Sequence, residues 1–374
     1  MEKINILTSL TAGSGFFLSF LLYNHPLNIN KNANRWLSIF IFFLSLSILE
    51  ISLVYENFNV HFPYYFELIG ISRYLVAPLL YISIFCFTSL EQRFNRLHLY
   101  SFLPFLIILI FRIPYFLTGK NLEFEPIIEK IVFLILQLLL PIQAILYWTL
   151  SFLRLRLHTE NIGKVESSTE KINLKWLNYF LLIILLIIVI WFNLIFFDIT
   201  LLKTYTPLLY LFSIFFVGYF ALRQNKVYKY GENEIKKLDE IVTSSNEPNR
   251  QKRLSEEQTS VLNNKLIILM ETEKFYLEND LNLVKLANKL DTTPNEISFV
   301  INELHKQNFN NYVNKFRIIE AKKLLLSDEY LNLNIVGIAY QSGFNSKTTF
   351  NTTFKKIAGI SPTDFLKLNN QNIK

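Results

Sequence analysis

Seven long apolar runs in the first 222 residues constrain this chain more than any other feature. Each is about 17 to 23 residues long, enough to cross a hydrocarbon core of roughly 30 Å at about 1.5 Å per residue. The stretch Thr11-Ala-Gly-Ser-Gly15 makes the first run the least apolar. The sequence therefore predicts an all-α protein that begins with a seven-helix transmembrane bundle, with spans at Ile6–Tyr23, Trp36–Val54, Ile69–Ser89, Leu97–Leu117, Ile131–Ser151, Leu177–Phe197 and Thr206–Leu222.

Basic residues predict the orientation of these spans. If the N-terminus lies outside, twelve Lys and Arg fall in the inner loops and just after the last span, far more than in the outer segments. Cytoplasmic loops of membrane proteins carry such an excess. We therefore expect a multi-pass protein of the bacterial inner (cytoplasmic) membrane, in contact with membrane lipid, with its N-terminus outside and its C-terminal domain in the cytoplasm.

Composition divides the chain into three parts. Residues 1–222 are predicted to form a transmembrane sensor domain, and residues 223–254 a polar juxtamembrane helix and linker. Ser255 followed by Gln258 has the pattern of a capping box, which predicts a helix over residues 256–275. This helix would begin the C-terminal domain, residues 255–374.

The C-terminal domain contains one short pattern twice. Leu281-Asn-Leu-Val-Lys-Leu-Ala287 returns as Leu333-Asn-Ile-Val-Gly-Ile-Ala339, with an asparagine at the N-cap position of a short amphipathic helix in both copies. Each copy then turns, the first before Pro294 and the second at Gly343, and enters a second helix. The apolar stripe of that second helix is Ile297, Ile301 and Leu304 in the first copy and Phe350, Phe354 and Ile357 in the second.

A long helix, predicted over Phe309–Leu326, joins the two copies. Helix, tight turn and helix, with a polar outer face on the second helix, is the arrangement that places a recognition helix in the major groove of DNA. One such pattern is weak evidence because capped helical hairpins are common, but two copies on one joining helix are a much stronger indication. The sequence therefore predicts two helix-turn-helix subdomains that bind double-stranded DNA.

From about Asn263 to Lys367 the sequence resembles the DNA-binding domain of the AraC family of bacterial transcription regulators. The matching positions are Ala287, Ile297–Asn302, Asn308–Arg317, Ala339–Phe344, Phe350, Phe354, Lys355, Gly359 and Pro362. The resemblance implies groove-facing side chains in two recognition helices, which are Asn295, Ser298, Phe299 and Asn302 in the first, and Lys347, Thr348, Asn351, Thr352 and Lys355 in the second.

Two departures from the family's pattern alter the expected contacts with DNA. Many relatives have an arginine where this chain has Phe299 and Thr352. We therefore expect readout through asparagine to adenine, apolar contact with thymine methyl groups, and DNA shape. The family's terminal aromatic–arginine pair is Phe365-Leu366 here, which removes one expected phosphate contact.

These features together predict a membrane-bound one-component transcription regulator that binds promoter DNA under the control of an unknown small-molecule or membrane signal. RNA polymerase is the expected protein partner, and the resemblance favours activation. From residue 254 on, 14 Lys and Arg stand against 13 Asp and Glu, so one domain has little net charge with which to hold phosphates. A homodimer, or paired direct repeats in the DNA, would compensate through avidity.

Six polar residues within or beside the predicted spans are candidates for an outward-facing sensor pocket, because charge in a bilayer is costly and tends to be paired or functional. They are Glu50, Arg73, Arg112, Gln137, Asn193 and Asp198, with Glu50 and Arg73 as the expected pair. Ion pairs that only hold the helices together are the structural alternative.

Catalysis has little support in the sequence. The chain has one cysteine and five scattered histidines, and its ten glycines form no phosphate-binding loop, so no enzymatic activity, cofactor or metal is expected. Two alternatives stay open. The protein could be a membrane transporter or receptor whose helical cytoplasmic domain binds a protein partner, or a regulator whose DNA-binding domain is released by proteolysis between residues 224 and 254.

Overall fold

The computed structural model describes residues 2–25, 27, 29–89, 96–122, 124–169, 172–197, 199–227, 238, 254–327 and 333–371. The regular elements in these ranges are helices, apart from one isolated antiparallel bridge between Glu166 and Asn282. The all-α prediction is confirmed. The chain forms two compact units, residues 1–157 with 174–228, and residues 158–173 with 229–374.

The seven apolar helices that the sequence predicts are all present in the described part of the chain. They are α1 (Glu2–Tyr23), α2 (Lys31–Tyr55), α4 (Pro63–Thr88), α5 (Leu103–Thr118, after the 3₁₀ helix η1 at Arg96–Phe102), α6 (Pro126–Val165), α7 (Lys175–Phe196) and α8 (Thr200–Arg223). Each is long and apolar enough to cross a membrane, α5 together with the residues of the 3₁₀ helix that precedes it. A short helix, α3 (Phe58–His61), connects α2 to α4. With 40 residues, α6 extends beyond its predicted span at both ends.

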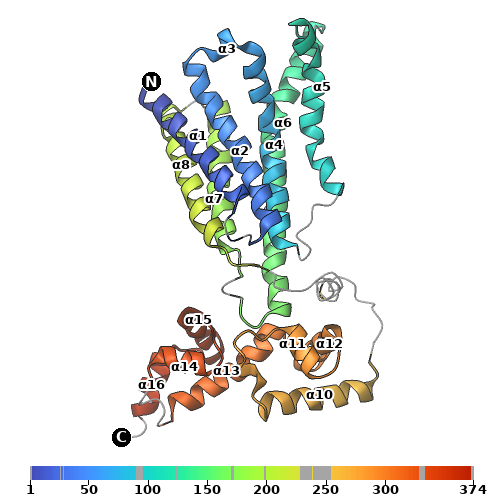
Figure 1. Ribbon diagram of the computed structural model, residues 1–374, viewed down its shortest axis with the longest axis vertical. Helices are drawn as coiled ribbons and strands as arrows, with labels where there is room; N and C mark the ends of the chain where they lie inside the picture. Colours follow the sequence, from blue (N-terminus) through green and yellow to red (C-terminus); the bar gives the residue numbers. More distant parts are fainter. Residues whose placement is uncertain are drawn as a thin grey trace. The chain divides into compact units, whose positions relative to one another are not determined.

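Small residues bring α1 close to its neighbours. α1 packs on α2 and α8, and α2 packs on α4 (Figure 1). A Cβ atom at Gly15 would lie 2.0 Å from Ser45 Oγ of α2, and Thr11 and Ala12 are buried. Three of the small residues that make the first span less apolar, Thr11, Ala12 and Gly15, therefore lie on its contact face, as small residues do between membrane helices, whereas Gly13 is exposed.

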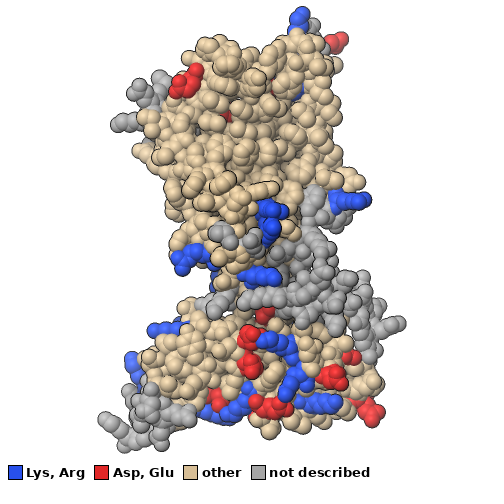
Figure 2. Space-filling model, in the orientation of Figure 1, with Lys and Arg blue, Asp and Glu red and all other residues tan. Residues whose placement is uncertain are grey.

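The outward faces of these helices are apolar. Phe20, Ile110 and Phe215 are 64%, 65% and 62% exposed. Charged side chains are sparse on the face of these helices that Figure 2 draws. Extensive apolar surface of this kind is costly in water and compatible with lipid. Together with the lengths of the helices, it indicates membrane association.

The second unit contains the predicted pair of helix-turn-helix copies. Its helices are α10 (Glu256–Glu271), the 3₁₀ helix η3 (Phe275–Leu277), α11 (Leu283–Lys289), α12 (Pro294–His305), α13 (Phe309–Leu325), α14 (Ile335–Gln341), α15 (Lys347–Ala358) and α16 (Pro362–Gln371). The joining helix α13 contacts α12 on one side and α14 and α15 on the other (Figure 1).

The predicted helix starts are confirmed by their hydrogen bonds. At α10, the Gln258 N–H donates to Ser255 Oγ at 3.1 Å and the Ser255 N–H donates to Gln258 Oε1 at 2.9 Å, which is the expected capping box. This helix ends at Glu271, before the predicted Phe275. In the repeated helices α11 and α14, the side-chain oxygens of Asn282 and Asn334 each accept a backbone N–H at 2.9 Å.

The turns of the two copies share one conformation but reach it with different residues. Asp291 and Gly343 hold equivalent places, ten residues after the start of each repeated pattern, and have φ values of 53° and 87°. Asp291 is exposed, and aspartate tolerates this left-handed conformation. At Gly343 a Cβ atom would lie 2.7 Å from the backbone oxygen of Tyr276. The second turn therefore requires glycine because of a close contact as well as because of its φ.

A row of aromatic side chains holds the second copy on α13. Phe344, Phe350 and Phe354 are at most 1% exposed, and their ring centroids follow one another at 5.4 and 5.6 Å. Phe365 of α16 packs on Phe354 at 5.6 Å, and Leu366 is buried in the same cluster. The two residues that stand in place of the family's aromatic–arginine pair thus complete this core.

Candidate nucleic-acid interface

The first candidate recognition helix, α12, begins at a capping box. The Glu296 N–H donates to Thr293 Oγ1 at 3.3 Å and the Thr293 N–H donates to Glu296 Oε2 at 3.0 Å, while proline occupies the first turn as predicted. Ile297 and Ile301 are buried, as the apolar stripe predicts. The third member of that stripe is wrong, because Leu304 is 47% exposed and borders a groove between α12 and α10.

The predicted groove-facing residues of α12 share one face of the helix, at i, i+3, i+4 and i+7, and differ in how far they are exposed. Asn302 is exposed, and its side-chain amide donates to the hydroxyl of the half-buried Ser298 at 3.3 Å. Asn295 is half-buried in the first turn. Phe299 lines the groove of about 530 Å³ between α12 and α10. The polar surface of α12 is therefore centred on Ser298 and Asn302, with Phe299 beside it.

The second candidate recognition helix, α15, presents one continuous polar face. Its N-cap is Ser346, whose hydroxyl accepts the Thr349 N–H at 3.2 Å. Phe350 and Phe354 point inward, but Ile357 is 41% exposed, so the last member of this predicted stripe is also wrong. The five predicted groove-facing residues are all accessible, since Asn351 is half-buried and the others are exposed: Lys347, Thr348, Thr352 and Lys355.

A shallow groove of about 520 Å³ runs between α15 and the start of α16. It is lined by Asn351, Thr352, Lys355, Lys356, Ser361, Pro362 and Thr363. Sequence reasoning missed Lys356, whose ammonium donates to Asn311 Oδ1 at 3.2 Å. The adjacent pair Lys355-Lys356 was the available signal, because consecutive cations near a recognition helix are suited to phosphate contacts.

Charge is distributed unequally between the two copies. Residues 254–308 hold five Lys and nine Asp and Glu, whereas residues 333–371 hold four Lys and one Asp. Figure 2 shows side chains of both signs mixed on the drawn face of the second unit. Since cationic side chains supply most of the attraction to phosphates, the copy that contains α15 is the more favourable of the two for DNA.

A buried carboxylate ties the joining helix to the η3 loop. Glu320 of α13 is 7% exposed and accepts hydrogen bonds from Lys274 Nζ at 2.7 Å and from the Tyr276 hydroxyl at 3.1 Å. Burial by itself would raise the pKa of Glu320, but these hydrogen bonds and the charge of Lys274 outweigh it and lower the pKa. Burial, followed by the nearby carboxylate, raises the pKa of the Tyr276 hydroxyl. The carboxylate therefore stays ionised at neutral pH.

Of the six candidate sensor residues, the structure pairs two with each other. Arg73 Nε of α4 lies 3.3 Å from Glu50 Oε2 of α2, so the expected pair forms. Arg112 instead lies 3.0 Å from Glu67. Asp198 lies outside the described residues.

Two further candidates lie on α6 and α7. Gln137 is exposed on α6, whereas Gln143, which sequence reasoning missed, is buried and donates to the Tyr74 backbone oxygen at 2.8 Å. At about 100° per residue, positions six apart lie on different faces of a helix, which explains the difference. Asn193 is half-buried in the last turn of α7. Among the described residues, no group of three His, Cys, Asp or Glu side chains is placed to hold a metal ion.

Two capped helix-turn-helix units on one joining helix form the C-terminal domain, which is the arrangement that the resemblance to the AraC family predicts. Comparison with known families agrees, because the family model described as "Helix-turn-helix domain" matches residues 286–368. A similar solved structure is the C-terminal domain of AraT, a response regulator from Geobacillus stearothermophilus. The match is 29% identical, covers 31% of this chain and 88% of that one, and has a TM-score of 0.26. Comparison with curated proteins gives no match.

Proposed function

We propose that this protein is a membrane-bound one-component transcription regulator, in which the AraC-type domain binds promoter DNA while seven spanning helices anchor it in the membrane. The observation that carries the proposal is the presence, in one chain, of seven membrane-length apolar helices and two capped helix-turn-helix units with polar outer faces. A soluble regulator does not need the first feature, and a transporter does not need the second.

The orientation follows from the location of DNA. The C-terminal domain lies in the cytoplasm, in agreement with the twelve Lys and Arg that the sequence places on the inner side. An odd number of spans then puts the N-terminus outside. In this proposal the bundle of apolar helices receives a small-molecule or membrane signal, and the bound domain acts on transcription through RNA polymerase.

Contacts from α15 contribute most to the proposed complex. Asn351 is suited to pair with the edge of an adenine, and Lys347 to contact a phosphate or a guanine. A well-formed bidentate contact is worth roughly 1–3 kcal/mol of discrimination, or about 5- to 150-fold in affinity. Removing both side chains should therefore eliminate specific binding at a cellular concentration of the protein.

The test is genome-wide mapping of DNA crosslinked to the full-length protein in its membrane. We expect a few sharp sites for the native chain and none for a Lys347→Ala/Asn351→Ala variant. The matched control is Asn264→Ala/Lys265→Ala, which removes one exposed asparagine and one exposed lysine from α10, outside the matched domain. It should keep the sites. A flat profile for the native chain, or equal loss in both variants, would refute the proposed function.

A further inference from the structure

The segment between α6 and α7 is part of the second unit. Residues 158–173, which we call the 158–173 segment, group with the C-terminal domain, although the sequence suggested that they belong to the first domain. Ile162, Val165 and Ser167 in this segment are 4%, 4% and 1% exposed. This segment links two of the apolar helices directly to the DNA-binding domain, in addition to the covalent linker after α8.

Backbone and side-chain hydrogen bonds fix the segment at one place on the domain. Glu166 forms the isolated antiparallel bridge with Asn282, the N-cap of α11. The Ser167 N–H donates to the Leu281 backbone oxygen at 3.3 Å, and the Ser167 hydroxyl donates to the same oxygen. From α13, the side-chain amide of Asn310 donates to the backbone oxygens of Glu166 at 3.1 Å and Ser167 at 2.9 Å.

Ser167 also meets the most buried charge of the domain. Arg317 of α13 is 0% exposed, and its hydrogen bonds in the described part of the chain all go to neutral oxygens. They are the backbone oxygens of Tyr276 at 2.8 Å and Glu278 at 2.7 Å, and the Ser167 hydroxyl at 3.2 Å. Burial lowers the pKa of Arg317 to about 10, so the side chain is still charged at neutral pH. Loss of Ser167 would therefore remove an acceptor from a buried cation, which is unfavourable.

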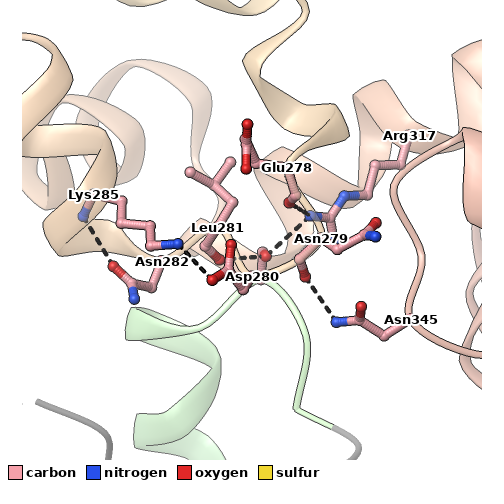
Figure 3. Close-up of polar contacts among 9 residues, drawn as sticks. Glu278, Asn279, Asp280, Leu281, Asn282, Lys285, Arg317 and Asn345 are labelled. Carbon is pink, nitrogen blue, oxygen red and sulfur yellow. Dashed lines mark hydrogen bonds and ion pairs between the residues drawn. The ribbon is translucent and has the colours of Figure 1, made fainter.

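Arg317 lies where the two helix-turn-helix copies meet (Figure 3). Its guanidinium stands 5.8 Å from the Phe344 ring, directly after the turn glycine of the second copy. Beside it, the side-chain amide of Asn345 donates to the backbone oxygen of Asn279, just before α11 of the first copy, at 2.7 Å. These contacts join the loop that precedes α11 and α12 to the turn between α14 and α15. The angle between α12 and α15 therefore depends on them.

We propose that the 158–173 segment is the docking element through which the membrane helices set the angle between the two recognition helices. This inference rests on the proposed function and names its regulation. None of the contacts above uses a predicted groove-facing side chain, so docking leaves both recognition helices accessible. We call the contacts of Arg317 and Asn345 between the two copies the Arg317 joint. A shift of α6 against α7 would move the 158–173 segment and so disturb this joint. The spacing at which α12 and α15 enter successive major grooves would then change.

An engineered disulfide tests whether the segment is docked in the full-length protein. An ideal Cβ atom at Gly163 lies 4.0 Å from Asn310 Cβ, within the range of about 3.5–4.5 Å that a disulfide needs. We would introduce Gly163→Cys and Asn310→Cys together in a Cys86→Ala background and oxidise native membranes. The expected result is loss of both free thiols in the double variant and of neither in the single variants. Two free thiols in folded protein after oxidation would refute docking.

Substitutions at two neighbouring serines test whether docking of the 158–173 segment stabilises the contacts around Arg317. Ser167→Ala removes the hydroxyl that contacts Leu281 and Arg317, whereas Ser168→Ala changes a half-buried serine one residue away. We expect Ser167→Ala, but not Ser168→Ala, to speed hydrogen exchange at least tenfold in residues 341–346 of the full-length protein. Unchanged exchange in residues 341–346 of Ser167→Ala would mean that the docked segment does not affect the contacts between the two copies. That result would overturn the inference.

DNA binding separates the two proposals. The docking inference alone would be refuted if the variants occupy genomic sites as the native chain does and either of two results is found. These are free thiols in the oxidised double-cysteine variant, or unchanged hydrogen exchange in Ser167→Ala. Absence of binding by every variant, the native chain included, would refute the proposed function and the inference that rests on it. Oxidation of the disulfide variant should retain binding to some sites and alter the preferred spacing between half-sites, and unaltered spacing would count against the inference.

Discussion

Replacing Gly343 with alanine should loosen the joint between the two helix-turn-helix copies. Alanine in the left-handed conformation, at a φ of 87°, costs about 1 kcal/mol. The new Cβ atom would lie 2.7 Å from the Tyr276 oxygen and 3.0 Å from both Leu277 Cα and Arg317 Nε. Because two of these atoms belong to the backbone, the surrounding chain must move, which costs about 2 kcal/mol more. The expected total of about 3 kcal/mol corresponds to roughly a 150-fold change in an opening equilibrium.

Gly359 provides the matched control for this prediction. It has a φ of 80°, and a Cβ atom there would meet nothing within 4 Å. Gly359→Ala should therefore cost only the conformational part, about 1 kcal/mol or roughly fivefold. The assay is native-state hydrogen exchange of the buried amides of α13 in the full-length protein in lipid nanodiscs. Equal effects of the two substitutions would show that the close approach of the new Cβ atom to the Tyr276 oxygen adds no steric cost, and would refute the reasoning.

Two further predictions concern the same domain. Asn334→Ala should destabilise α14 by about 1 kcal/mol, because the hydrogen bond from the Gly337 N–H to the capping side chain is lost. Asn334→Asp should keep this hydrogen bond. The hydrogen-exchange rates of the α14 amides would distinguish the two variants. Glu320 should contribute stability that is complete above about pH 4.3, the ordinary value in an unfolded chain, and that is lost as the pH falls through its lowered folded-state pKa. Because Lys274 is 46% exposed and screened by solvent, we expect about 1 kcal/mol from the pair. Urea unfolding of Glu320→Gln should lose that pH dependence, and a variant with the native pH profile would contradict the assignment.

The C-terminal fold could be predicted in detail because its determinants are local. Helix caps at Ser255, Asn282 and Asn334 depend on residues three apart, and the glycine of the second turn depends on one φ value. The errors have a common cause. Leu304 and Ile357 continue a helical stripe, but periodicity shows only which residues share a face and not where the packing partner of that face ends.

Contacts between distant segments were not predictable from the sequence in the same way. Polar residues in the apolar helices were recognisable as unusual, and one pair, Glu50 with Arg73, could be expected. The pairing of Arg112 with Glu67, by contrast, depends on how α5 packs against α4. Ser167 gave no signal, since it is one of two adjacent serines in a polar loop, and its role arises only from the position of Arg317, 150 residues further on.

The unequal charge of the two copies bears on how such a regulator would hold DNA. The first copy, with nine acidic residues against five lysines, gains little from counterion release, so its contribution is the reading of base edges through Ser298 and Asn302. The second copy, with four lysines against one aspartate, supplies the phosphate contacts. A single domain would then have one anchored end and one weakly held end, and its specificity would depend on how firmly the joint at Arg317 keeps α12 in register with α15. Under the proposed function, a rigid joint therefore keeps the first copy on the DNA although that copy has little positive charge. A signal that alters the joint would change the sequence preference of the domain before it changed the total affinity for DNA.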